Sequence, residues 1–254
     1  MAQVQSVERT FSILEIVAQY PSGISITALA KEMDLAKSTV HRLLGTLVAR
    51  GYVQKDAHTG YYQLGVQCLV LASSLLNNLD IRSIAKDALH RLAEYAGEVV
   101  HLCIHDQNEV VYIDKVESEQ TLRMYSQIGK RALMHCTGVG KALLSGFSEQ
   151  AIDQLVKEKG LPSFTDTTIT TKEELEQSLK TIQEQGYAID EQEHEMGIRC
   201  IAAPIFDHDG HVVAAISIAG PIERMTKERV EGDLTRAILK ESHDISAKLG
   251  YLNK

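Results

Sequence analysis

The order of elements expected in the first 65 residues constrains the fold of this chain more than any other feature. Apolar residues recur at helical spacing in three short stretches, at residues 7–18, 26–33 and 37–48. Ser6 is the expected N-cap of the first helix, Ser25 precedes the second, and Gly51 ends the third. Two strand-like runs joined by a turn follow, at residues 52–54 and 61–64. Three helices and a hairpin in this order predict a winged helix-turn-helix, whose third helix enters the major groove of DNA.

The third of these helices has one apolar face and one polar face. Its outward polar residues, together with one hairpin lysine, are the predicted DNA contacts: Lys37, Ser38, Thr39, His41, Arg42, Thr46 and Lys55. Lys37 and Arg42 can donate hydrogen bonds to phosphates or to guanine O6 and N7, and hydroxyls near the helix N-terminus suit phosphates. The same spacing also fits an ordinary amphipathic helix in a small bundle.

Charge is distributed unevenly along the 254 residues. Residues 1–65 hold six Lys and Arg against five Asp and Glu, whereas the other 189 hold 20 against 29. Because an acidic surface repels DNA, any nucleic-acid contact is assigned to the first segment. The four cysteines form no CxxC pair and no export signal is evident, which favours a reducing cytoplasm. The uncharged residues 57–79 include glycines and many polar side chains, so no membrane span is expected.

The rest of the chain alternates helices and strands, and several strands are joined by tight hairpins. Hairpins require antiparallel pairing, so an α+β fold with flanking helices is expected, including a strand at 121–125 and an uninterrupted helix from 226 to about 249. We expect a DNA-binding domain, a linker helix and an effector-binding domain at residues 1–65, 66–79 and 80–254. The linker carries an apolar stripe that is expected to pair with a second copy or to pack on the second domain: Leu69, Ala72, Leu75, Leu76 and Leu79.

A set of segments spread over nearly the whole chain is typical of one protein family: residues 26–30, 35–44, 51–53, 62–65, 135–144, 186–190, 197–205 and 214–221. In these segments and in their order, the sequence resembles the isocitrate-lyase-regulator (IclR) type of bacterial transcription factor. The resemblance implies an N-terminal DNA-binding domain, a linker helix and a C-terminal effector domain related to GAF-type sensors. It also implies a dimer or tetramer that binds a palindromic DNA operator and needs no cofactor. Repression of a catabolic operon is expected, with a small organic acid, such as a sugar acid of the ketodeoxygluconate kind, as the effector.

The segment Thr137–Gly140 before a helix suggests where that acid binds. Free N–H groups at a helix start suit a carboxylate, although glycine can also stand there only for close packing. The resemblance places the effector where five residues converge and three more form apolar walls: Gly138, Val139, Asp190, Cys200 and Ser217, with Leu122, Met124 and Ile198 as the walls. Ala219 departs from the second serine of some members that bind small keto acids, so the same ligand is not implied.

Three patterns suggest other chemistry. His101, Cys103 and His105 share one strand face and could bind a metal, but no fourth ligand has suitable spacing, and a packed strand is favoured. Residues 207–211 also look metal-like, yet a polar hairpin turn explains them better. Cys200 could serve a thiol enzyme, although no nucleophile motif surrounds it. The alternative function is therefore a metabolite-binding protein or thiol enzyme whose N-terminal segment contacts other proteins.

Overall fold

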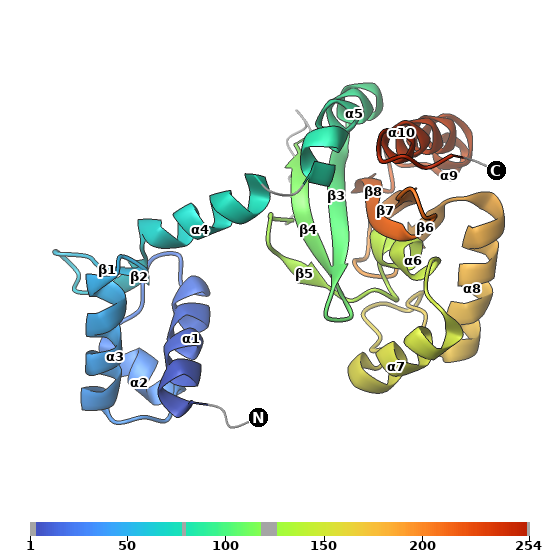
Figure 1. Cartoon of the computed structure of the whole chain (residues 1–254). Coiled ribbons are helices and arrows are strands. Elements are labelled where there is room, and N and C mark those ends of the chain that lie inside the picture. Colours follow the sequence, from blue (N-terminus) through green and yellow to red (C-terminus); the bar gives the residue numbers. More distant parts are fainter. Residues whose placement is uncertain (1–3, 78–79, 118–125, 253–254) are drawn as a thin grey trace. The chain divides into compact units, whose positions relative to one another are not determined.

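The computed structural model describes residues 4–77, 80–117 and 126–252, and the chain divides into two units, Met1–Asn78 and Leu79–Lys254. The first unit holds α1 (Gln5–Ala18), α2 (Ile26–Glu32), α3 (Lys37–Ala49), β1 (Val53–Lys55), β2 (Tyr62–Leu64) and α4 (Val66–Asn77). β1 and β2 form an antiparallel hairpin, and the three helices enclose a core that includes Ile13, Leu29 and Leu44 (Figure 1). The predicted winged helix-turn-helix is present.

Helix capping agrees with the sequence in one helix and differs in another. The Ser25 side chain accepts a hydrogen bond from the Ala28 N–H at 3.2 Å, as expected of an N-cap. Ser6 is not an N-cap, because α1 begins at Gln5, two residues earlier than expected, and Val4 is its N-cap. Val7 and Glu8 donate their N–H groups to the Val4 carbonyl, so backbone bonding extends the helix by two residues that the apolar periodicity does not mark.

α4 presents large apolar side chains outside any core. Leu69 is 66% exposed, and Val66, Val70 and Leu71 are also exposed. Ala72, another member of the predicted stripe, is exposed as well. The side chains of Leu75 and Leu76, and the whole of Leu79, lie outside the described part of the structure. The exposed apolar surface thus reaches beyond the predicted stripe, on a helix with no Asp, Glu, Lys or Arg.

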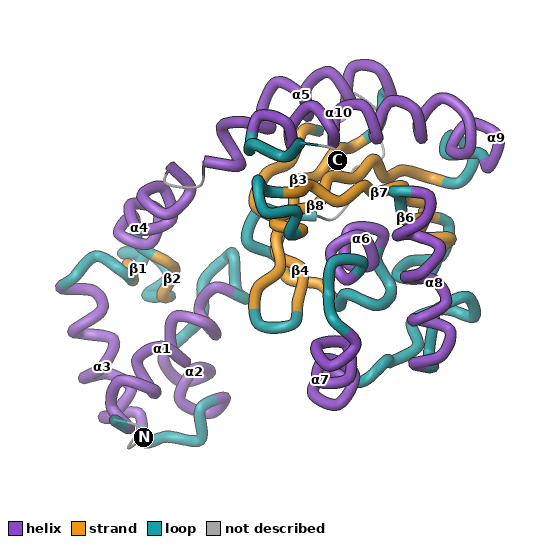
Figure 2. Tube along the Cα trace, turned by 45° about the vertical axis from the view of Figure 1, so that its right-hand side comes forward, coloured by secondary structure: helices purple, strands orange, loops and turns teal. Residues whose placement is uncertain are grey.

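The second unit is built on one antiparallel sheet with helices on both faces. Its elements are α5 (Asp80–Ala96), β3 (Val99–Asp106), β4 (Glu109–Val116), β5 (Arg131–Ala132), α6 (Gly138–Leu144), α7 (Glu149–Lys159), α8 (Lys172–Gln185), β6 (Ala188–Glu191), β7 (Ile198–Phe206), β8 (Val212–Pro221), α9 (Lys227–Arg229) and α10 (Thr235–Lys248). The strand order is β5-β4-β3-β8-β7-β6. α5 and α10 cover one face, and α6, α7 and α8 the other (Figure 2). The expected α+β fold is confirmed.

The helix expected from residue 226 to about 249 is not uninterrupted. Val230–Leu234 form a π-helical turn between α9 and α10, where the Thr235 hydroxyl donates to the Val230 carbonyl at 2.6 Å. Apolar periodicity cannot reveal such a local change of winding. The strand expected at 121–125 falls outside the described residues, and β5 was not expected. No helix in the described ranges is long and apolar enough to cross a membrane.

Candidate functional site

The first candidate site is the outward face of α3. Val40, Leu44 and Leu47 are buried in the core of the first unit, whereas the predicted DNA contacts on this helix are exposed, apart from half-buried Thr39. Ala36 at the N-cap makes no side-chain hydrogen bond, so the first N–H groups of α3 can meet an anion. Lys55 on β1 is exposed, with its ammonium 5.6 Å from the centre of the Tyr62 ring. These cations and amides are all accessible.

No sequence pattern marks Gly45, yet it lies on the same exposed face of α3. A Cβ added there would meet no atom within 4 Å, so internal packing does not require glycine. Glycine inside a helix is destabilising by roughly 0.5–1 kcal/mol relative to alanine. A bare backbone next to Arg42 and Thr46 therefore suits the close approach of another molecule.

The second candidate site is a cavity in the second unit. It is lined by His101, Tyr112, Ser126, Lys130, Ala132, Thr137, Gly138, Val139, Asp190, His194, Glu195, Ile198, Cys200, Ser217 and Ala219. The cavity has a volume of about 70 Å³. One water needs roughly 10–15 Å³ of such a cavity, so the space holds several waters or one small organic molecule.

The structure brings together six of the eight predicted effector contacts at this cavity: Gly138, Val139, Asp190, Ile198, Cys200 and Ser217. The other two, Leu122 and Met124, lie outside the described residues. No sequence pattern predicts an effector contact for the other polar residues that line the cavity, which are His101, Tyr112, Ser126, Lys130, His194 and Glu195. Antiparallel pairing of His101 with Ser217 explains part of the difference, because strand register is not visible in a single sequence.

A chain of side-chain hydrogen bonds crosses one wall of the cavity. The His101 Nε2 lies 2.8 Å from the Ser126 Oγ, and its Nδ1 lies 3.3 Å from the Ser217 Oγ. Burial lowers the pKa of His101 to about 3, so the ring is neutral and has one N–H donor and one acceptor nitrogen. One serine must therefore donate to the ring while the other accepts from it. The Tyr112 ring packs edge-on against His101, with 5.1 Å between ring centres.

The start of α6 supports both explanations of its glycines. The Thr137 hydroxyl accepts from the Gly140 N–H at 3.1 Å, whereas no acceptor among the described residues reaches the N–H groups of Gly138 and Val139. A Cβ on Gly138 would lie 2.9 Å from the Cys200 sulfur, and one on Gly140 would lie 2.3 Å from the Met134 carbonyl oxygen. Close packing thus requires both glycines, and it also brings the free amides to the cavity.

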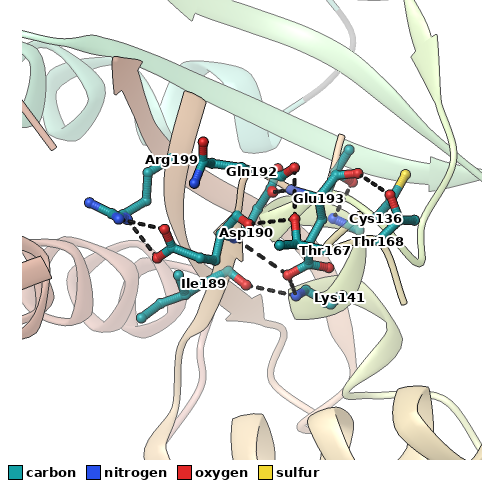
Figure 3. A network of polar contacts seen from close by, with 12 residues as sticks. Cys136, Lys141, Thr167, Thr168, Ile189, Asp190, Gln192, Glu193 and Arg199 are labelled. Carbon is teal, nitrogen blue, oxygen red and sulfur yellow. Dashed lines mark hydrogen bonds and ion pairs between the residues drawn. The ribbon is translucent and has the colours of Figure 1, made fainter. Parts of the chain in front are cut away.

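Asp190 ends a buried polar network behind the cavity (Figure 3). Its Oδ1 accepts the Glu193 N–H at 2.7 Å. The Lys141 ammonium, on α6, donates to the Ile189 carbonyl at 2.7 Å and forms an ion pair with the Glu193 carboxylate. All three charged side chains are at least nine-tenths buried. The network therefore fixes where the Asp190 carboxyl meets the cavity.

Three threonines hold the backbone turn that follows β6. The hydroxyls of Thr165, Thr167 and Thr168 donate to the carbonyls of Gln192, Glu191 and Glu193 at 2.7, 3.0 and 2.6 Å. The turn contains Gln192 at a φ of +62°, a left-handed conformation that is uncommon for residues other than glycine. These bonds fix the turn between Asp190 and His194, which both line the cavity.

Burial controls protonation around the cavity. Loss of hydration, followed by repulsion from Glu193, raises the pKa of Asp190 to about 7. Burial raises the pKa of Cys200 and of Cys136 to about 12 each, so both remain thiols at neutral pH. It also lowers the pKa of His194. Since a nucleophilic cysteine must form a thiolate, Cys200 is unsuited to the enzymatic alternative.

The His–Cys–His strand does not gather ligands. His101 bonds two serines, Cys103 is buried in the core, and the His105 ring packs edge-on against Phe147. Alternate residues of a strand stand nearly 7 Å apart, which separates the three side chains. Among the described residues, no group of three His, Cys, Asp or Glu could hold a metal ion. Asp207 accepts the N–H groups of Asp209 and His211, so this segment is a polar hairpin turn.

Comparisons with known proteins match both units. The model of the "IclR helix-turn-helix domain" matches residues 6–57, and that of the "Bacterial transcriptional regulator IclR C-terminal" domain matches residues 73–247. The transcriptional repressor IclR of Escherichia coli is 35% identical over 250 residues, which cover 98% of this chain and 91% of the repressor.

Solved structures share the fold. The crystal structure of the Thermotoga maritima IclR superposes with a TM-score of 0.82 at 33% identity, covering 98% of this chain and 100% of that one. An IclR homolog from Microbacterium hydrocarbonoxydans, solved in complex with 4-hydroxybenzoate, has a TM-score of 0.84 at 22% identity, with 96% and 98% covered. At that identity the second structure supports the fold alone. With family models over both units and a 35% identical repressor along almost its whole length, the chain belongs to the IclR family of bacterial transcriptional regulators, and it is a regulator rather than an enzyme.

Proposed function

We propose that this regulator represses transcription by binding a palindromic operator with the α3 helices of two copies, and that a small carboxylic acid in the cavity changes its affinity for DNA. The observation that carries the proposal is the cavity, where the amides of Gly138 and Val139 meet Asp190, Cys200 and Ser217 in a chain that also has a helix-turn-helix. Such a protein acts in the cytoplasm.

The exposed face of α3 supports the DNA-binding part. Lys37 and Arg42 are accessible cations, and the uncapped helix start suits a phosphate. Lys55 lies on the β1–β2 hairpin, which corresponds to the wing of this class of domain. We infer that it contacts the DNA backbone, as a wing does. We therefore assign base contacts to α3 and backbone contacts to Lys55.

The chemistry of the cavity supports a small acid with hydroxyl or keto groups. Free amides suit a carboxylate, while the hydroxyl–imidazole chain through His101 can pair with ligand oxygens. Ala219 lines the cavity without a hydroxyl, which leaves one donor fewer than a serine would supply. The modest volume favours a small ligand or a small portion of a larger one. A sugar acid fits this chemistry better than a plain fatty acid.

The exposed apolar side chains of α4 support a dimer. A helix with exposed Val66, Leu69, Val70 and Leu71 and no charged residue is a poor surface for water. A second copy would cover it, and a palindromic operator requires the same two-fold symmetry. Sedimentation at micromolar concentration should show a dimer or tetramer; a monomer alone would contradict this part.

A mobility-shift titration on the DNA upstream of the protein's own gene tests the whole proposal. Specific retention that weakens with salt is expected, because phosphate contacts release counterions. Repeating it with a keto acid, a sugar acid and an aromatic acid should change the retention with at least one of them. No specific retention at any salt concentration would overturn the regulatory function.

A further inference from the structure

Among the described residues, the Asp190 carboxyl forms no ion pair. Lys141, on α6, is the cation nearest in the network, and its ammonium is already engaged by the Glu193 carboxylate and the Ile189 carbonyl. Among the described residues, no donor reaches the Oε2 of Glu193. The pair of Lys141 and Glu193 is thus electrically neutral, with one carboxylate oxygen unsatisfied, and the charge of Lys141 lowers the pKa of Asp190 less than the charge of Glu193 raises it.

The other titratable groups that face Asp190 carry no charge near neutral pH. They come from β4, the segment before α6, and β7: Tyr112, Cys136 and Cys200. Burial raises the pKa of each of them, so all three remain protonated. On the cavity wall, the imidazoles of His101 and His194 have lowered pKa values and are neutral. Lys130 and Glu195 line the same cavity with opposite signs.

Among these buried groups, Asp190 is the one whose charge changes near neutral pH. We propose that the effector binds here as an anion together with one proton, that Asp190 holds this proton, and that Lys141 and Glu193 position its carboxyl. The inference rests on the proposed function, since it concerns the same effector cavity. It adds a condition on the ligand, which must be an acid whose carboxylate enters accompanied by a proton.

Two physical reasons favour the proton. An ionised Asp190 beside a ligand carboxylate would place two like charges in a buried site, which disfavours binding. A protonated Asp190 instead has an O–H that can donate to the ligand carboxylate, while its Oδ1 keeps the hydrogen bond from the Glu193 N–H. The pKa of Asp190, raised to about 7, means that the proton is available at physiological pH. Above that pH the ligand must recruit it from solvent.

The test is calorimetric titration of the full-length protein with sodium salts of pyruvate, gluconate and 4-hydroxybenzoate, in two buffers with different heats of ionisation. At about pH 8, binding of the active acid should take up close to one proton, and its affinity should fall about tenfold per pH unit above the pKa. At about pH 6, where Asp190 already holds its proton, the uptake should approach zero. In the unliganded protein, carbon NMR of the Asp190 carboxyl should show a midpoint near neutrality.

Three variants separate this mechanism from a structural role. Asp190→Asn keeps an acceptor and supplies a fixed N–H donor, so it should bind the acid with no proton uptake and no pH dependence. Glu193→Gln removes the neighbouring negative charge and should move the pH midpoint of binding downward. Asp209→Asn changes an exposed carboxylate in the β7–β8 turn and should behave as the parent.

Each outcome decides between the mechanism and the proposed function. An Asp190 carboxyl that titrates in the ordinary range would overturn the proton mechanism whether or not an acid binds. So would acid binding that is independent of pH in the parent and unchanged in Asp190→Asn, while leaving the effector function intact. If none of the three acids binds at either pH although operator DNA is retained, the assignment of an acid effector is wrong, and the inference fails with it.

Discussion

The two candidate sites of this regulator are built in opposite ways. The face of α3 comes from one continuous stretch of 13 residues, its cations are exposed to water, and its helix start is uncapped. The cavity draws its lining from several strands, the start of α6 and the turn after β6, and its polar groups include the buried, hydrogen-bonded side chains of His101, Asp190 and Ser217. Exposed charges bind a charged partner with little change in their own protonation. Buried groups make protonation part of recognition.

Lys141→Met should have the largest effect, because it removes the cation that is paired with the buried Glu193 carboxylate. Breaking a buried ion pair on one side is destabilising by about 3–5 kcal/mol. Urea unfolding should show this loss in the free energy of unfolding of the variant, or Lys141→Met should fail to fold. Lys180→Met, an exposed position on α8, is the matched control and should be close to the parent. Equal stability of the two variants would show that the network does not depend on its cation.

Asp190 should make folding stability depend on pH in the direction opposite to an ordinary salt-bridged carboxylate. Its pKa is raised from 3.8 to about 7 in the folded protein, so the folded state holds one proton more than the unfolded chain between these values. The free energy of unfolding therefore falls as pH rises towards 7 and levels off above it. Relative to Asp190→Asn, the parent should lose on the order of 2–3 kcal/mol between about pH 5 and about pH 7. If the free energies of unfolding of the parent and of Asp190→Asn differ by the same amount at every pH, the pKa of Asp190 is not raised.

Arg42→Ala tests the exposed site. Loss of a base or phosphate contact should weaken specific operator binding by roughly 1–3 kcal/mol while the fold survives. Lys55→Ala should instead weaken binding to all sequences alike and reduce its salt dependence. Mobility shifts on operator and on scrambled DNA measure both effects. If Arg42→Ala binds the operator as tightly as the parent, the DNA face lies elsewhere.

Ser217→Ala and Asp190→Ala should separate sensing from DNA binding. Ser217 partners His101 in the cavity wall, and its removal should weaken effector binding by about 1 kcal/mol. An effector acts through its different affinity for two states of the protein, so operator affinity without effector should stay the same. The measurement is a DNA titration with and without the active acid. A full response in both variants would place the effector site elsewhere in the second unit.

Gly45→Ala should give the smallest effect. It should raise the free energy of unfolding and weaken operator binding, as urea unfolding and mobility shifts would measure. Alanine should stabilise α3 by about 0.5–1 kcal/mol, because the site has open space and no left-handed backbone. The added methyl group should at the same time weaken operator binding if DNA approaches this point of the helix. A more stable variant with unchanged operator binding would remove Gly45 from the interface.

Much of the first unit and the order of elements in the second follow from local sequence. Apolar spacing defines α3, and Ser25 and Thr171 accept the N-cap hydrogen bonds that their positions suggest. Signals of this kind act over three or four residues, which is why they can be read from one sequence. Such signals do not predict the π-helical turn at Val230–Leu234 or the residue at which α1 begins, because backbone hydrogen bonding decides both.

The cavity shows most clearly which features local sequence patterns cannot predict. Local patterns predict the helix-turn-helix and the antiparallel α+β class, and the family resemblance predicts six of the residues found around the cavity. The contacts of His101 depend instead on strand register, which places its ring between two serines and not with Cys103 and His105 at a metal. Burial likewise raises the pKa of Asp190 to about 7, while Lys141 forms its ion pair with Glu193. Desolvation and long-range pairing depend on residues distant in sequence, and no local pattern records them.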